Sequence, residues 1–205
     1  MNIIPAQTSD FDSAIDCLVE AFVDDGHMKY LFGANVAVRH RNIREFFSVL
    51  LAVRFALTMP VLVAKSGNQV AGLVMGYDTT RPEWPPQLAD RWSLIWAQQQ
   101  SMKERLDRVD VVSEKFKPAL PHYYLGAIAV TPTWQGKGVG GALIKAFCQT
   151  SDDDKMSRGT YLETGESTNA AYYRARGFQL SGQDLLDGQF AYYCMFRPKP
   201  AVQLA

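Results

Sequence analysis

One segment of the sequence has residue types that suit the binding of a phosphorylated ligand. This glycine loop reads Gln135-Gly136-Lys137-Gly138-Val139-Gly140-Gly141, after an apolar run at 123–130 and before a helical segment at 142–147. Backbone N–H groups at the beginning of a helix lack internal partners, and the helix dipole favours negative charge there. Glycine permits positive φ and lets a phosphate approach the backbone. The loop therefore predicts a pyrophosphate site, in which Lys137 either adds a cation or stays solvated.

The same glycines allow two other interpretations. Gly136, Gly138 and Gly141 satisfy the spacing G-x-G-x-x-G of dinucleotide-binding folds, and Glu163 follows at about the distance of a ribose contact. That fold needs its first glycine directly after the strand, whereas a turn with Pro132 intervenes here, and too little chain follows for a doubly wound sheet. An NAD-dependent oxidoreductase is therefore disfavoured. A glycine-rich turn that binds nothing is the other alternative.

Two later segments could place side chains beside a ligand in the loop. Tyr161-Leu162-Glu163-Thr164 reads as a strand, and residues 169–176 read as a short helix ended by a glycine. In that helix, Tyr173 lies about one turn after Asn169 and on the same face. Tyr172 lies about a third of a turn away and is predicted to be a core residue.

These motifs, in this order and spacing, resemble the acetyl-CoA site of the GNAT superfamily of N-acetyltransferases. The loop is similar to that family's pyrophosphate loop, and residues 169–178 are similar to its Asn-x-x-x-Tyr-x-x-x-Gly-Phe helix. His122-Tyr123-Tyr124-Leu125 and the closing run at 194–199 are similar to small-molecule acetyltransferases related to puromycin N-acetyltransferase. The match covers residues 122–199, whereas the preceding part agrees only in the order of its elements.

The resemblance implies acetyl-CoA as the acyl donor. Backbone amides of the loop would hold its pyrophosphate, and its pantetheine arm would lie along Ile128, Ala129 and Val130 in a splay between the strands near 123–130 and 160–164. Tyr173 would approach the thioester sulfur. Because a phenol has a pKa near 10 and a thiol near 8.5, donation of a hydrogen bond fits Tyr173 better than complete proton transfer. Asn169 either contacts the pantetheine or serves as a helix N-cap.

An amine acceptor must lose a proton before it attacks a thioester. Glu163 is the best candidate for the general base, with Glu166 and His122 as further candidates. A lone glutamate on a strand can equally be the partner of an Arg or Lys, and a water chain could take the proton instead. A backbone N–H within residues 126–128 is the expected oxyanion donor.

The elements that must position these groups are indicated by apolar periodicity. A strand at 2–5, a helix from residue 8 closed by Asp24-Asp25-Gly26, a helix at 35–57 and a hairpin at 61–75 precede the motifs. An insert at 78–121 contains an irregular Pro-rich stretch and one long helix with an apolar stripe from Leu88 to Val109, which includes Gln99. A hairpin at 178–196, turned at Asp187-Gly188, closes the chain. The expected fold is α/β (α+β), a GNAT-like, mostly antiparallel sheet of about seven strands flanked by helices, in one domain over 1–205.

Composition limits the partners. The chain has 205 residues, 47% of them hydrophobic, and no net charge at pH 7, so neither nucleic acid nor a membrane is an expected partner. Its three scattered cysteines predict neither a disulfide framework nor a metal site, and favour a cytoplasmic setting. The expected acceptor is a primary amine of a small molecule. A peptide or protein N-acetyltransferase and a non-catalytic acetyl-CoA sensor are the alternatives, and the state could be monomer or homodimer.

The acceptor pocket is expected between two parts of the chain. These are the helical stretch 83–117, with Trp84, Trp92 and Trp96, and the helix around 46–55. Aromatic walls suit an apolar or cationic ligand. Most of these side chains are nevertheless expected to belong to the core.

Overall fold

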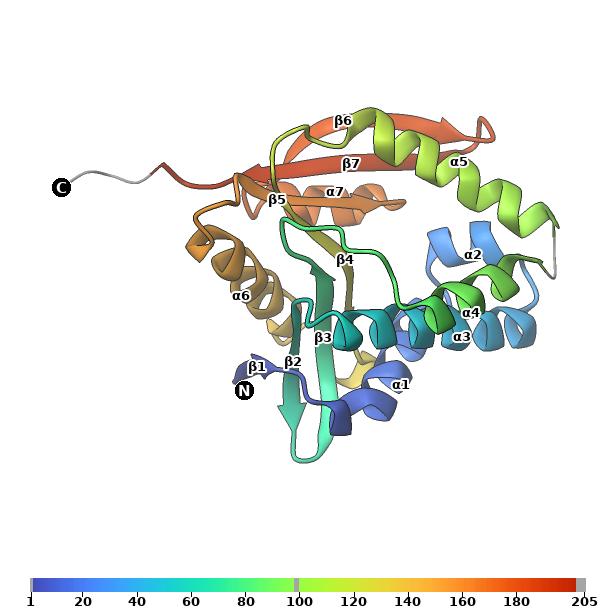
Figure 1. Cartoon of the computed structure of the whole chain (residues 1–205), viewed down its shortest axis with the longest axis horizontal. Helices are drawn as coiled ribbons and strands as arrows, with labels where there is room; N and C mark the ends of the chain where they lie inside the picture. Colours follow the sequence, from blue (N-terminus) through green and yellow to red (C-terminus); the bar gives the residue numbers. More distant parts are fainter. Residues whose placement is uncertain (1, 98–99, 202–205) are drawn as a thin grey trace.

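The protein is built around a seven-stranded sheet. A computed structural model describes residues 2–97 and 100–201. In Figure 1 the strands follow the order β1-β2-β3-β4-β5-β7-β6, and all neighbours are antiparallel except β4 and β5. The mostly antiparallel seven-stranded sheet predicted from the sequence is confirmed. The strands are β1 (Ile3–Pro5), β2 (Val61–Ser66), β3 (Gln69–Tyr77), β4 (Tyr123–Val130), β5 (Gly159–Thr164), β6 (Gln179–Leu186) and β7 (Phe190–Pro198).

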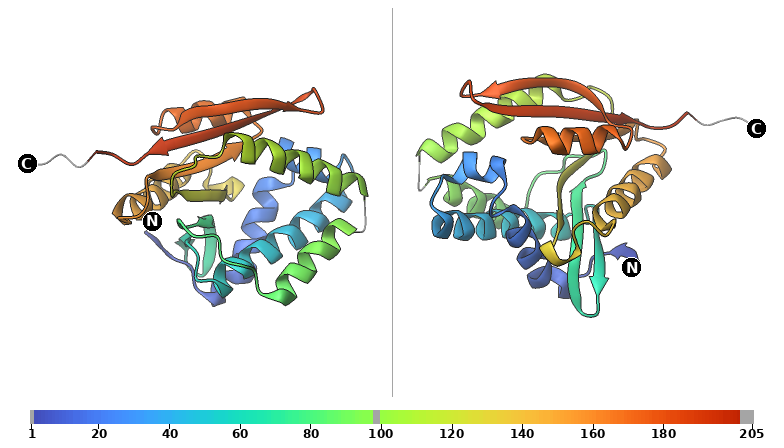
Figure 2. Two further views of the ribbon diagram at one scale, coloured as in Figure 1. Left: turned by 45° about the horizontal axis from the view of Figure 1, so that its top comes forward. Right: turned by 180° about the vertical axis from the view of Figure 1, so that it is seen from behind.

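Helices cover both faces of this sheet (Figure 2). The helices α6 and α7 pack on one face around Leu143, Phe147 and Phe178, and α1 to α5 share a larger core on the other face. The helices in the described residues are α1 (Phe11–Phe22), α2 (Gly26–Phe32), α3 (Val36–Ala56), α4 (Pro86–Ala97), α5 (Gln100–Phe116), α6 (Val139–Asp153) and α7 (Ser167–Arg174).

The sheet splays between its two parallel strands. β4 and β5 pair only at Tyr123–Thr160 and Tyr124–Tyr161, after which no pairing continues. On its other side β4 contains a bulge, since Met75 faces Ala127 while the next residue of β3 faces Leu125. A bulge bends its strand and increases the local twist. The predicted splay is therefore present, and the edge of β4 that faces β5 is open beyond Tyr124.

Two predicted helices differ from the observed ones. Asp24-Asp25-Gly26 does close α1, but Asp25 is also the N-cap of α2, with its Oδ1 accepting a hydrogen bond from the Met28 N–H at 3.0 Å. Aspartate favours a helix start as strongly as a turn, so α2 was missed. The long helix expected in the insert is two helices, α4 and α5, and Gln99 of its stripe lies outside the described residues.

Candidate active site

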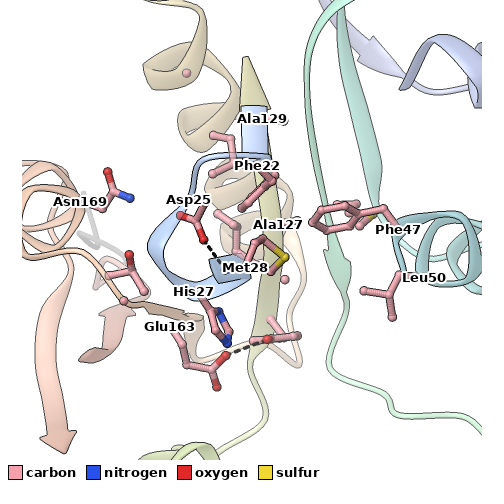
Figure 3. Close-up of a pocket in the computed structure, with 18 of the residues that line it drawn as sticks. Phe22, Asp25, His27, Met28, Phe47, Leu50, Ala127, Ala129, Glu163 and Asn169 are labelled. Carbon is pink, nitrogen blue, oxygen red and sulfur yellow. Dashed lines mark hydrogen bonds between the residues drawn. The ribbon is translucent and has the colours of Figure 1, made fainter. Parts of the chain in front are cut away.

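A cavity of about 880 Å³ opens where β4 and β5 separate. Figure 3 shows residues of α2, α3, β4 and β5 around it. Lys137 and Gly141 are the two predicted site residues that do not line it. The structure brings the others together around the cavity: Ile128, Ala129, Val130, Gln135, Gly136, Gly138, Val139, Gly140, Glu163, Asn169 and Tyr173.

The glycine loop exposes backbone amides to this cavity. Gly136 and Gly138 have φ values of 72° and 83°, and a Cβ at either position would meet nothing within 4 Å. Gly138 is the N-cap of α6. The first hydrogen bond within this helix runs from the Ala142 N–H to the Gly138 carbonyl, at 3.1 Å. The amides before Ala142 thus lack an intrahelical partner. A pyrophosphate fits this open, donor-rich cradle.

The cation that lines the cavity beside the loop is Arg176, not Lys137. Lys137 turns its Nζ over the ring of Trp134, 4.8 Å from the centroid. Arg176 lines the cavity instead, and its Nη2 would be 3.3 Å from a Cβ at Gly141. The Arg176 guanidinium stacks on the ring of Tyr172 at 3.3 Å. The prediction that Tyr172 is core was wrong, because α7 lies at the cavity and leaves this side chain 40% exposed.

The open edge of β4 gives the cavity a second row of polar backbone groups. Residues 125–130 of β4 have no strand partner on the β5 side, and the Val130 carbonyl accepts a hydrogen bond there from Gln135 Nε2 at 3.1 Å. The other N–H and C=O groups on that edge can pair with an extended ligand. Gly126 is the bulged residue of the strand, and it also lines the cavity. The predicted oxyanion donors, at 126–128, therefore lie at the point where the strand bends.

Two side chains of α7 reach the cavity from beside the loop. The N-cap of α7 is Glu166, so the N-cap alternative for Asn169 is excluded. Tyr173 is 7% exposed, and its ring lies edge-on to Phe178 with the centroids 5.6 Å apart. Burial raises the pKa of the Tyr173 hydroxyl above its ordinary value. The hydroxyl therefore stays protonated and is suited to donate a hydrogen bond.

Glu163 lies in the interior of the site with a phenol as its partner. The Tyr124 hydroxyl donates a hydrogen bond of 2.7 Å to Glu163 Oε2. Burial raises the pKa of the Glu163 carboxyl, and the hydrogen bond from Tyr124 opposes that shift. In the described part of the chain, no Arg or Lys forms a salt bridge with Glu163. A carboxylate of raised pKa that faces a cavity is suited to take a proton.

The other two candidate bases lie outside the cavity lining. His122 Nδ1 is 2.7 Å from the Leu120 carbonyl. Glu166 caps α7 and approaches Gly26, where a Cβ would be 2.3 Å from its Oε1. Of the three predicted candidates, Glu163 alone lines the cavity.

His27 of α2 is a site residue that the sequence analysis missed. It lines the cavity beside Glu163 (Figure 3), and its Nε2 is buried with no hydrogen-bond partner among the described residues. Burial lowers the pKa of His27 to about 4, so the ring is neutral at pH 7. Its ring lies edge-on to Tyr192, with the centroids 5.2 Å apart. Because α2 itself was not predicted, no signal in the sequence pointed to His27.

Aromatic side chains of α3 and the insert form another wall of the cavity. Phe46 and Phe47 of α3 line the cavity with Trp84 and Trp92 of the insert. The Trp92 ring centroid lies 5.3 Å from that of Phe46 and 5.4 Å from that of Trp84. Trp96 does not line the cavity and is 3% exposed. The same cluster of aromatic rings therefore forms both the cavity wall and part of the hydrophobic core, as expected.

Residues 2–97 and 100–201 contain neither a cluster of metal ligands nor a candidate membrane-spanning helix. No group of three or more His, Cys, Asp or Glu side chains is arranged to hold a metal ion. None of the helices described there has both the length and the apolar character needed to cross a membrane. Cys17, Cys148 and Cys194 are buried free thiols.

Solved structures with the same fold include several acetyltransferases. A protein from Corynebacterium glutamicum, described as histone acetyltransferase HPA2 and related acetyltransferase, is 24% identical with a TM-score of 0.72, and the match covers 99% of this chain and 98% of that one. A mosquito arylalkylamine N-acetyltransferase like 5b is 12% identical with a TM-score of 0.60, covering 96% and 100%. A ribosomal-protein-alanine N-acetyltransferase from Brucella melitensis is 16% identical with a TM-score of 0.55, covering 97% and 99%.

Sequence comparison gives the family more directly. No curated protein matches the chain. The profile of the acetyltransferase (GNAT) domain matches residues 59–180, more than half of the 205 residues. That range contains β3, β4, the glycine loop, α6, β5 and α7, which together form part of the cavity lining. The chain therefore belongs to the GNAT family of acetyltransferases.

Proposed function

We propose that this acetyltransferase uses acetyl-CoA and transfers the acetyl group to a primary amine of a small molecule. One observation carries the proposal. The loop amides that lack an intrahelical partner, the open edge of β4 and the half-buried Glu163 carboxyl all face a single cavity. A donor-rich cradle for a pyrophosphate and a base of raised pKa are the two requirements that this chemistry places on the protein.

Residues of three elements would hold acetyl-CoA. The Gln135 N–H donates to the Pro132 carbonyl at 3.3 Å, so the loop amides from Gly136 to Gly140 would bind the pyrophosphate, with Arg176 supplying positive charge beside them. The unpaired edge at Ile128–Val130 would pair with the amide groups of the pantetheine arm, and Asn169 would add a side-chain hydrogen bond. When bound, acetyl-CoA supplies the activated acetyl group.

The remaining side chains would control protons and charge. Glu163 accepts a proton from the ammonium group of the acceptor, directly or through one water, and Tyr124 keeps the carboxyl oriented. Backbone N–H groups around the bulge at Gly126 stabilise the negative charge that develops on the carbonyl oxygen, an effect worth roughly 3 kcal/mol per donor. The Tyr173 hydroxyl donates a hydrogen bond to the departing sulfur.

The walls of the cavity favour a small acceptor over a peptide. The insert helix α4 contributes Trp92 to the cavity lining, and the insert helix α5 contributes Leu106 and Val109. Such walls enclose an acceptor of limited size and apolar character. The resemblance to acetyltransferases related to puromycin N-acetyltransferase supports the same class. We further propose a single catalytic domain over residues 1–205, acting in the cytoplasm as a monomer or homodimer.

Calorimetric titration with acetyl-CoA, with NAD as the control ligand, tests the proposal. Binding with a Kd near micromolar, about −8 kcal/mol, and no binding of NAD are expected. Release of free thiol in the presence of small amines should follow. Failure to bind acetyl-CoA would refute the proposal. Binding without turnover of any amine or peptide would favour a sensor, and turnover of N-terminal peptides alone would favour the peptide alternative.

A further inference from the structure

Arg54 is a buried cation in the cavity wall without a carboxylate partner. It lies in the last turn of α3 and is 3% exposed. Its Nη1 donates to the Leu50 carbonyl at 3.2 Å, whereas its Nε is buried with no hydrogen-bond partner in the described residues. No salt bridge to Arg54 occurs within that part of the chain. A buried charge left unpaired in this way is destabilising.

The structural contacts of Arg54 account for only part of its guanidinium. Its Cζ lies 4.2 Å from the centroid of the Tyr77 ring, and its Nη1 donates to the Leu50 carbonyl one turn earlier in α3. These contacts use the ring face and one nitrogen. They leave Nη2 without a hydrogen-bond partner among the described residues, and a guanidinium N–H is a strong, charge-assisted donor to a carboxylate.

The free side of the guanidinium faces the bulge of β4. A Cβ at Gly126 would lie 3.5 Å from Arg54 Nη2 and 3.2 Å from Tyr124 Cε1. Because Gly126 has no side chain, this space belongs to the cavity, which both Arg54 and Gly126 line. An anion on Arg54 would therefore lie next to the backbone where the acyl carbonyl is proposed to bind.

A negative group lies on the other side of the same tyrosine. The Tyr124 hydroxyl donates a hydrogen bond to Glu163. The edge of the Tyr124 ring lies beside the space at Gly126 that Arg54 Nη2 faces. Figure 3 shows Leu50, one turn before Arg54, and Glu163 on opposite sides of the cavity. The site thus presents a guanidinium and a carboxylate on either side of Tyr124.

We infer that the acceptor is an amino acid whose carboxylate binds Arg54, whose amine faces Glu163 and whose apolar side chain packs on the aromatic wall. This inference rests on the proposed function and specifies its substrate. The ammonium loses one proton to Glu163, and the neutral amine attacks the acetyl carbonyl. The N–C amide bond forms, the C–S bond breaks, and the second amine proton leaves with the sulfur as a thiol.

Matched pairs of substrates test the inference. Phenylalanine, tryptophan and methionine are compared with the amines that lack only their carboxylates, using kcat/KM for thiol release. In the unmodified protein, at least one acid should exceed its amine by about tenfold or more. Arg54→Met should lower the ratio of acid to amine by roughly 100-fold, the effect of truncating one partner of a buried charge pair. Arg54→Lys should give an intermediate ratio, because it keeps the charge but not the position of the guanidinium donor.

Two controls separate this inference from the proposed function. Arg44→Met, on the same helix but in an exposed ion pair with Asp16, should leave the ratio unchanged. Acetyl-CoA titration of the Arg54 variants reports whether they fold and keep the cofactor site. Equal loss of acid and amine turnover with acetyl-CoA binding retained would overturn the inference, as would acids that are no better than their amines or not used at all. No binding of acetyl-CoA by the unmodified protein would instead refute the proposed function.

Discussion

At the level of single residues, burial and hydrogen bonding act on Glu163 in opposite directions. Burial favours the protonated carboxyl and raises its pKa, whereas the hydrogen bond from Tyr124 favours the carboxylate. The same burial raises the pKa of Tyr124 well above its ordinary value, so Tyr124 remains the donor. A base in this state binds a proton more strongly than a surface glutamate and still ionises, which suits the deprotonation of an ammonium group.

The raised pKa of Glu163 predicts how activity depends on pH. A base must be ionised to act, so kcat/KM should decrease as pH falls through the pKa, by about tenfold per unit. The decrease should begin at a higher pH than it would for an exposed glutamate. Glu163→Gln should lower kcat/KM by roughly 100-fold or more and remove this limb of the profile. Glu166→Gln, three residues away and outside the cavity lining, should keep it; a limb that survives Glu163→Gln would assign the base elsewhere.

Tyr173 should affect turnover rather than binding. Tyr173→Phe removes the hydroxyl but keeps the ring that packs on Phe178, so the fold and the affinity for acetyl-CoA should change little. Loss of a hydrogen bond to a developing thiolate should lower kcat by roughly 10- to 100-fold. Steady-state kinetics and calorimetry together measure both effects. Unchanged kcat would exclude Tyr173 from the departure of the sulfur.

The residues that the sequence predicted best share a common property. Glu163, Asn169 and Tyr173 belong to contiguous motifs, where spacing along one strand or helix fixes which side chains share a face. Arg54 and His27 belong to segments without such motifs, and they reach the site only because α3 and α2 pack beside β4. Which distant elements become neighbours depends on tertiary packing, and a local pattern carries no information about it.

At the level of elements, the glycine loop works through its backbone. Gly138→Ala places a methyl group at φ 83°, where an alanine is destabilised by about 1 to 2 kcal/mol, and the methyl enters the space proposed for the phosphates. The Kd for acetyl-CoA should rise at least about tenfold. Gly67→Ala is the matched control, because Gly67 has φ 61° and equally open surroundings in the β2–β3 turn. Equal effects of both variants on the Kd would contradict the placement of the pyrophosphate.

Elements with long apolar periodicity were predicted well, and elements defined by polar boundaries were not. α1, α3 and the two hairpins follow the predicted ranges closely. α6 continues to Asp153, beyond the helical segment expected at 142–147, because helical packing of its apolar face outweighs the low helix propensity of Ser and Asp. The insert divides into two helices because α4 packs against α3 whereas α5 packs against β6, an arrangement that a single continuous stripe does not reveal.

At the level of the whole molecule, the buried neutral His27 should make stability depend on pH. Its pKa in the folded protein is about 4, compared with 6.5 when exposed. The folded state therefore binds the proton less readily than the unfolded state, and the stabilisation present above pH 6.5 is lost as pH falls toward 4. Between pH 7 and 4.5 this residue should account for roughly 2 kcal/mol of the decrease in unfolding free energy.

Urea unfolding at both pH values measures this contribution. His27→Gln, which cannot be protonated, should show a decrease smaller by that amount. His40→Gln, at an exposed position of α3, should behave like the unmodified protein. If the two variants lose the same free energy between pH 7 and 4.5, His27 is protonated in the folded state at a higher pH than its burial implies.

The two pairs that join β4 to β5 have a consequence for cooperativity. The strands β1 to β4 and the strands β5 to β7 are each extensively paired, but few backbone hydrogen bonds connect the two sets. Each set can then open as a separate unit in native-state hydrogen exchange. A pantetheine arm paired with the free edge of β4 would add a ladder at this seam. Ligand binding should accordingly slow amide exchange in β4 and β5 together, and should merge two unfolding units into one.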